Sequence, residues 1–166
     1  MKRFSLLCMV LILIFVFSGC QKDNYFTYKS DDNDWSMKIP KTFQKESEET
    51  IAEIKLKMIV FKDNKGKTFS INEIIDPDME ISEESLKIEM EADTYLKPER
   101  TEIMDVEGFG KIYGVLFEDH ATESNVWYYR VRLDDKVTSF AIYQKSKFTF
   151  EEETEIKSFL STLKKL

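Results

Sequence analysis

Alternating apolar and polar positions predict short β-strands along most of the chain. In residues 35–40 (WSMKIP) the apolar side chains fall at every second position, and the closing proline has no N–H for a strand ladder. Similar runs, many of them rich in β-branched and aromatic residues, predict strands at residues 25–28, 56–61, 69–75, 102–106, 112–118, 125–133 and 137–144. The polar stretch 46–52 lacks the alternation and is expected to form a short helical turn.

Two short turns predict how neighbouring strands pair. Residues 63–67 (DNKGK) separate the strands 56–61 and 69–75, and Gly66 supplies the positive φ that a tight hairpin turn favours. Residues 134–136 (DDK) connect the strands 125–133 and 137–144 in the same way. Hairpins between consecutive strands predict a mainly antiparallel sheet.

Two helices are expected among these strands. Ser82 is a typical N-cap for a helix that runs to about Tyr95, with Leu86 and Met90 facing inward. Its apolar stripe is thin, so we expect this helix to lie on the surface of the sheet. Thr149 and Glu152 form a capping-box pair at the start of the second helix. Its apolar face recurs at spacings of three and four residues, at Ile156, Phe159, Leu160 and Leu163.

The pattern therefore predicts an α+β fold, with a mainly antiparallel β-sheet flanked by a middle helix and a C-terminal amphipathic helix. Residues 25–166 have the usual length of one domain, and no internal repeat or second boundary interrupts them. A chain of this length can bury a substantial core without disulfides.

The first twenty residues have the pattern of an exported protein. Lys2 and Arg3 precede an apolar run at residues 4–17, and Ser-Gly-Cys follows, ending at Cys20. This segment resembles the lipobox of bacterial lipoproteins, with Phe17 where that family prefers leucine. The resemblance implies a signal peptide at residues 1–19, removed on export, and a lipid-modified Cys20 that carries diacylglycerol and often a palmitate-type acyl chain.

The lipoprotein interpretation has two alternatives. An uncleaved transmembrane helix needs about 20 consecutive apolar residues, and this run is shorter. A plain secreted protein would make no use of Cys20. On the lipoprotein interpretation, residues 20–24 form a lipidated tether to the membrane. The domain then lies in the bacterial cell envelope, facing the periplasm or the cell exterior.

Cysteine content and charge restrict the chemistry of the mature chain. Cys8 leaves with the signal peptide and Cys20 carries lipid, so a disulfide, a thiolate metal site and a cysteine nucleophile are all excluded. The signal peptide holds two of the 24 basic residues and none of the 31 acidic ones, which leaves a mature net charge of −9. An acidic chain without a Lys/Arg-rich block argues against a nucleic-acid partner and against a basic membrane-docking face.

One segment carries a family resemblance. The strand 35–39, stopped by Pro40 and followed by Phe43, resembles the opening of PsbP/Mog1-like domains, and the predicted elements follow in a similar order. The resemblance implies an antiparallel sheet flanked by helices. It also implies a binding or assembly accessory, because members share no catalytic motif, and so no functional residue can be carried across.

The candidate ligand site lies on the strand 125–133. Tyr128, Arg130 and Arg132 share one face with Val126, and two guanidinium groups beside an aromatic ring can bind a carboxylate or a sugar. The alternative is that helices cover this face and the arginines pair with acidic residues.

Other candidate residues point less clearly to chemistry. His120 follows two acidic residues and could be half of a metal or acid–base site, or simply an exposed histidine. The turn 31–34 (DDND) offers oxygen ligands for calcium but lacks the glycine and distal glutamate of a calcium loop. No zinc pattern, nucleophile elbow or phosphate loop occurs, so we expect no metal and no cofactor.

The sequence thus favours a membrane-anchored envelope lipoprotein that acts as a non-enzymatic binding or assembly accessory. Its expected partners are membrane lipid through Cys20 and an envelope protein or small ligand. Two alternatives stay open: a divergent envelope hydrolase that uses acidic residues and His120, and a purely structural surface lipoprotein.

Overall fold

The computed structural model describes residues 24–32 and 34–166, so the predicted signal peptide and most of the predicted tether lie outside the described residues. The large sheet has seven strands, each antiparallel to its neighbours. In spatial order they are β3 (Gln44–Ile51), β4 (Leu56–Lys62), β5 (Thr68–Ile75), β9 (Lys136–Gln144), β8 (Ser124–Leu133), β7 (Gly110–Asp119) and β6 (Leu96–Val106).

A small antiparallel sheet and two helices complete the fold. In the small sheet, β2 (Trp35–Pro40) pairs with β1 (Tyr25–Lys29) on one side and with β10 (Lys164–Lys165) on the other. The helices are α2 (Glu83–Ala92) and α3 (Phe150–Leu160), and a 3₁₀ turn, η1 (Ala52–Ile54), joins β3 to β4. None of the described helices is long and apolar enough to cross a membrane. The fold is α+β with a mainly antiparallel sheet and two helices, as the sequence predicted.

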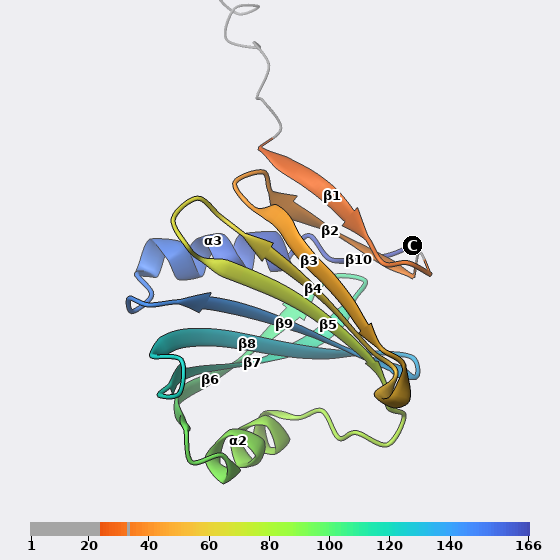
Figure 1. Cartoon of the computed structure of the whole chain (residues 1–166). Helices are drawn as coiled ribbons and strands as arrows, with labels where there is room; N and C mark the ends of the chain where they lie inside the picture. The colour runs from red at the N-terminus through yellow and green to blue at the C-terminus, as the bar shows by residue number, and fades with distance from the viewer. Residues whose placement is uncertain (1–23, 33) are drawn as a thin grey trace, which may run out of the picture.

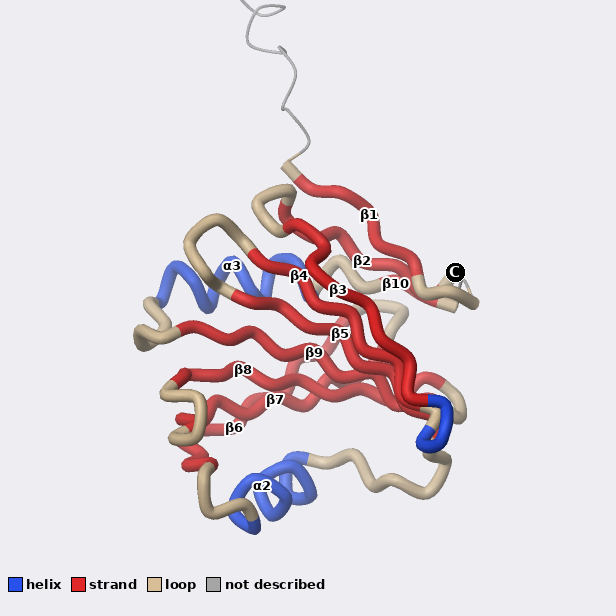
Figure 2. Tube along the Cα trace, in the orientation of Figure 1, coloured by secondary structure: helices blue, strands red, loops and turns tan. Residues whose placement is uncertain are grey.

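The large sheet separates two layers of different thickness. Figure 1 shows the small sheet and α3 on one side of it and α2 alone on the other. The strand-coloured tube in Figure 2 shows the same arrangement, with the large sheet twisted between the two layers.

The face toward α3 contains the main core. Buried side chains from both sheets and from α3 pack here, and Phe69 at its centre lies 5.3 Å from the ring of Phe159 and 5.9 Å from that of Phe61, centroid to centroid. On β8, Trp127, Tyr129, Val131 and Leu133, which alternate with the candidate ligand residues, are buried in this core. The alternation along β8 therefore corresponds to two faces of the strand, of which this one enters the main core.

The face toward α2 contains a smaller cluster. Its buried members are Met90, Val115, Phe117, Val126 and Ala141. The helix buries only Leu86 and Met90 of its own residues, as its thin apolar stripe predicted.

Both predicted helix starts are confirmed. The Ser82 hydroxyl accepts the N–H of Ser85 at 3.0 Å, and the Ser85 hydroxyl accepts the N–H of Ser82 at 2.9 Å. The Thr149 hydroxyl accepts the N–H of Glu152 at 3.2 Å, while the Glu152 carboxylate accepts the N–H of Thr149 at 3.0 Å. These bonds satisfy backbone donors that a helix start leaves without intrahelical partners.

The predicted helical turn at residues 46–52 is wrong, because this stretch forms most of strand β3. Every residue of β3 is exposed, so no side chain had to alternate between an inside and an outside. Backbone pairing with β4 holds the strand, with a register shift between Lys45 and Ser47. The sequence also missed β10, whose two lysines pair with Trp35 and Ser36 through the backbone.

Candidate functional site

The predicted ligand-binding residues of β8 lie under α2. Arg130 is only 5% exposed, and its guanidinium makes a two-pronged contact with the Glu89 carboxylate of α2, at 2.7 and 3.0 Å. The same guanidinium donates to the Tyr128 hydroxyl at 2.8 Å, and that hydroxyl donates to Ser139 at 2.8 Å. Burial opposes the charge, but Glu89 and Tyr128 outweigh it and hold the pKa of Arg130 above its ordinary value.

Arg132 also makes its polar contacts within the protein. Its guanidinium donates to the backbone carbonyl of Asp76, at 3.1 Å, and to that of Met79. Both carbonyls belong to the segment that leads from β5 to α2. The three residues therefore lie on one face, as the alternation predicted, and their polar groups contact protein groups of that face and of the α2 layer. A ligand site at Tyr128, Arg130 and Arg132 stays a prediction.

The acidic turn between β1 and β2 is tied to the end of the large sheet. Lys57 of β4 pairs with Asp31 and, at 3.0 Å, with Glu48, while Lys136 of β9 pairs with Asp32 and, at 2.8 Å, with Asp34. Ammonium groups thus occupy the oxygen-rich turn that was considered for calcium. Across the described part of the chain, no group of three or more His, Cys, Asp or Glu side chains is arranged to hold a metal ion.

A half-buried carboxylate lies behind this turn. Glu73 of β5 accepts the indole N–H of Trp35 at 2.9 Å, which links the large sheet to the small one. Burial raises the pKa of Glu73 above its ordinary value. Burial and the nearby Glu73 charge also raise the pKa of Tyr28, whose buried hydroxyl has no hydrogen-bond partner among the described residues. A small cavity of about 180 Å³ adjoins Glu73, Lys57 and Lys136.

His120 lies in the exposed turn between β7 and β8. Its backbone N–H donates to the carbonyl of Tyr95 at 2.9 Å. The neighbouring Asp119 carboxylate accepts the N–H groups of Ala121 and Thr122 and the Thr122 hydroxyl, at 2.9, 3.2 and 2.6 Å. Burial opposes its charge, yet these hydrogen bonds outweigh burial and lower the pKa of Asp119. The carboxylate therefore stabilises its own turn.

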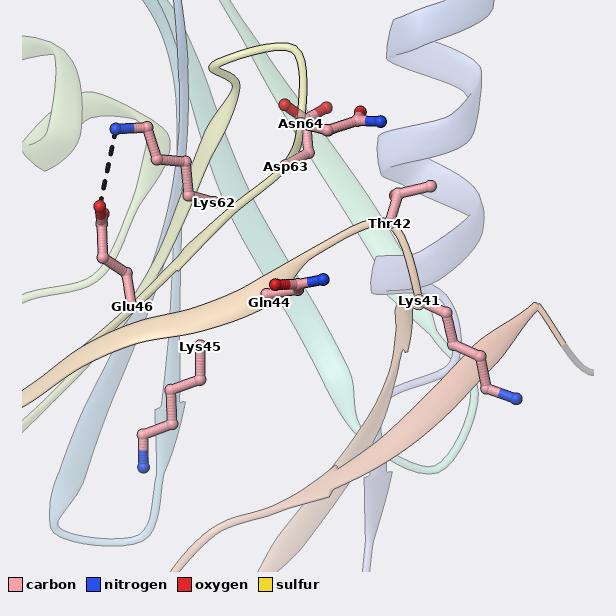
Figure 3. Close-up of a pocket in the computed structure, with 8 residues that line it drawn as sticks. All are labelled: Lys41, Thr42, Gln44, Lys45, Glu46, Lys62, Asp63 and Asn64. Carbon is pink, nitrogen blue, oxygen red and sulfur yellow. Dashed lines mark ion pairs between the residues drawn. The ribbon is translucent and has the colours of Figure 1, made fainter.

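A polar groove that the sequence did not predict lies beside the start of β1. It encloses about 500 Å³ and is formed by the β2–β3 loop, the first residues of β3 and the β4–β5 turn. Its lining residues are Lys41, Thr42, Gln44, Lys45, Glu46, Lys62, Asp63 and Asn64. Figure 3 shows the three lysine side chains pointing outward in different directions, with Lys62 turned toward Glu46 at 3.6 Å.

Sequence reasoning missed this groove for a physical reason. Its lysines are up to 21 positions apart, and they adjoin only because β3 pairs with β4. The stretch that forms β3 lacks the alternation that would have signalled a strand. No local motif marked these lysines as a group.

Comparisons with known proteins support the fold. No protein-family model matches the chain, and no curated protein sequence matches it. Among solved structures, it is similar to cyanobacterial PsbP (CyanoP) from Synechocystis sp., with a TM-score of 0.58, 10% identity, and coverage of 89% of this chain and 96% of that chain.

A second similar structure is the Ran-binding protein Mog1p of Saccharomyces cerevisiae, with a TM-score of 0.52 and 9% identity. The match covers 84% of this chain and 94% of that chain. The chain therefore has a PsbP/Mog1-like fold. Identities this low extend the likeness to the fold alone.

Proposed function

We propose that the protein is a bacterial envelope lipoprotein, held to the membrane through lipid on Cys20, whose domain is a non-enzymatic binding or assembly accessory. The observation that carries the proposal is the position of the first strand. β1 begins at Tyr25, and the carbonyl of Asn24 already accepts the N–H of Lys41 at 2.7 Å. A lipid on Cys20 would hold this end of the domain at the membrane and leave the opposite end free for a partner.

A binding role agrees with how the candidate chemical groups are used. Arg130 fastens α2 to the sheet, Arg132 fastens the segment before α2, and Asp119 stabilises the turn that carries His120. The fold is also that of Mog1p, which is described as a Ran-binding protein. We therefore favour a protein partner in the cell envelope over a small ligand.

The tip of the β3–β4 hairpin is the surface that we propose for this partner. Ile51 and Ile54 are 38% and 52% exposed, although large apolar side chains are usually buried. Ile51 pairs across the sheet with Leu56, and Leu56 pairs with Ile74, and both of these partners are half-buried, so a partly exposed apolar surface continues onto β4 and β5. Figure 1 shows this tip well away from the end where the tether leaves the domain.

Affinity capture from membranes tests the proposal. The full chain with a C-terminal tag is expressed in a bacterial host and chemically crosslinked before purification. We expect one or more envelope proteins to be enriched with it, and Ile54→Glu to abolish the enrichment. Ile103→Glu is the matched control, because Ile103 is 49% exposed on β6 at the other edge of the sheet. Repeated captures without an enriched protein would contradict the binding role.

A separate substitution tests the proposed lipid anchor. We expect Cys20→Ala to accumulate as an unprocessed precursor that incorporates no labelled fatty acid, because the predicted lipidation needs the thiol. Normal processing with continued lipid labelling would show that the lipobox interpretation is wrong.

A further inference from the structure

The lysines of the groove in Figure 3 lie at the end of the domain where the chain enters from the tether. Lys41 follows β2 directly, and its N–H bond to Asn24 fixes the groove beside the first described residue. Figures 1 and 2 both show the chain leaving the domain next to the loop between β2 and β3. The groove and the tether therefore belong to the same end of the molecule.

The tether is too short to hold this end far from a membrane. Residues 20–24 span at most about 18 Å even when fully extended, since each residue adds about 3.3–3.6 Å. If Cys20 is lipidated, the groove lies within one or two Debye lengths of the headgroups, where the Debye length is about 8–10 Å at physiological salt. Attraction between lysines and anionic headgroups falls off within about one Debye length, and a tether this short lets the groove approach the headgroups to that range.

The charge of the groove is opposite to that of the domain as a whole. The groove is lined by three lysines and two acidic residues, Glu46 and Asp63, so its lining carries a net charge of +1. Lys62 pairs with Glu46 at 3.6 Å, and Lys45 pairs with Glu48 just beyond the groove. Both pairs are exposed, and exposed pairs of this kind are weak enough for the lysines to exchange partners. Lys41 has no ion-pair partner among the described residues. A small excess of positive charge thus lies at the tether end of a chain whose predicted mature charge is −9.

We propose that Lys41, Lys45 and Lys62 bind anionic phospholipid headgroups of the membrane that holds Cys20, and so fix the orientation of the tethered domain. The inference rests on the proposed lipid anchor. The side chains point apart instead of converging on one position, which suits a layer of many headgroups better than a single small anion. This orientation would direct the β3–β4 tip away from the lipid.

The test measures orientation separately from anchoring. The mature lipidated chain has no free thiol, so Asn64→Cys allows one environment-sensitive fluorophore to be attached in the groove. The protein is reconstituted into phosphatidylcholine vesicles, with or without phosphatidylglycerol. Flotation measures anchoring, and shielding of the fluorophore from a water-soluble quencher measures contact with headgroups. We expect shielding only with phosphatidylglycerol, and its loss at high salt.

Two triple variants complete the experiment. The groove variant combines Lys41→Glu, Lys45→Glu and Lys62→Glu. It should abolish shielding while flotation persists, since each lysine near an anionic surface raises the affinity for that surface about fivefold. The matched control reverses three exposed lysines on the far side, Lys87, Lys97 and Lys111, and should keep the shielding. Equal shielding in both vesicle types, or retention in the groove variant, overturns the inference.

Two further outcomes separate failure of the anchor from binding of a different ligand. Failure of the unmodified protein to float overturns the anchor and the headgroup contact together. If inorganic phosphate abolishes the shielding of the fluorophore and chloride at equal ionic strength does not, the groove is a site for free phosphate. That result would overturn the assignment to lipid.

Discussion

The two faces of the large sheet are held by different kinds of interaction. Toward α3, 22 buried residues of the described chain form one continuous core, built largely from aromatic and branched side chains. Toward α2, the cluster has five buried members, and a buried guanidinium adds a directional contact. Apolar burial stabilises in proportion to area and without direction, whereas the Arg130–Glu89 pair fixes the position of one short helix.

The comparison indicates where the domain tolerates change. Removing apolar volume from the α3 side should lower the stability of the whole domain, because that core joins both sheets. Removing the ion pair should act mainly on α2, which buries only two of its own side chains. Four predictions test this difference, beginning with the largest effect.

Phe69→Ala should reduce the free energy of unfolding by about 3–5 kcal/mol, because it removes a fully buried ring from the centre of the core. Urea unfolding followed by tryptophan fluorescence measures the change. Phe150→Ala is the control, since Phe150 is 80% exposed and should change stability by less than about 0.5 kcal/mol. Similar effects from the two variants would contradict the assigned core.

Glu89→Gln should cost about 2 kcal/mol, because it leaves the buried Arg130 guanidinium without its counter-charge. This cost is smaller than the cost of breaking a fully buried pair, since the Glu89 side chain is 50% exposed. Adding Arg130→Met should recover much of the loss, because the unpaired charge is then removed. Hydrogen exchange should report faster opening of α2 in the single variant. A double variant no more stable than the single one would argue against this account.

Glu73→Gln tests the carboxylate between the two sheets. Because burial raises the pKa of Glu73, its contribution to stability is fully present below the unfolded pKa, ordinarily near 4.5, and is lost as pH rises through the higher folded pKa. The amide can still accept the Trp35 N–H. We therefore expect the variant to lose less stability than the parent between pH 4.5 and neutrality, as measured by urea unfolding. Glu155→Gln, on the exposed side of α3, should leave the parental pH dependence intact.

The smallest effect is expected from Glu91→Gln on the same helix as Glu89. Its pair with Lys87 is 3.8 Å long, and both side chains are more than half exposed. Such surface pairs contribute little, so the free energy of unfolding should change by less than about 0.5 kcal/mol. A loss equal to that of Glu89→Gln would show that burial does not distinguish the two glutamates.

Strands were predictable from the sequence where one face of the strand enters the main core and the other does not. On β8 one face enters the main core, so apolar residues recur at every second position and the strand was predicted. On β3 every residue is exposed, so the pattern carried no such signal and the stretch was assigned to a helical turn. Helix starts were predicted because Ser82 and Thr149 make local contacts with residues three positions later.

The candidate site was predicted only in part. Alternation placed Tyr128, Arg130 and Arg132 on one face, but the partner of Arg130 is Glu89, 41 positions earlier. The expectation that no basic face exists rested on the absence of a Lys/Arg-rich block. The groove instead combines lysines from two separate segments. The composition of either segment alone does not show that these lysines lie together.

By itself, the sequence determined the α+β class, most strands, both helix starts and the division of β8 into two faces, because periodicity and capping are local properties. Its lipobox pattern also predicts a lipid on Cys20, which the described residues do not include. The tertiary structure decided which side chains meet across long separations: Glu89 with Arg130, the acidic turn with Lys57 and Lys136, and the lysines of the groove beside the start of β1. Those contacts depend on strand order and helix placement, which no single stretch of sequence encodes.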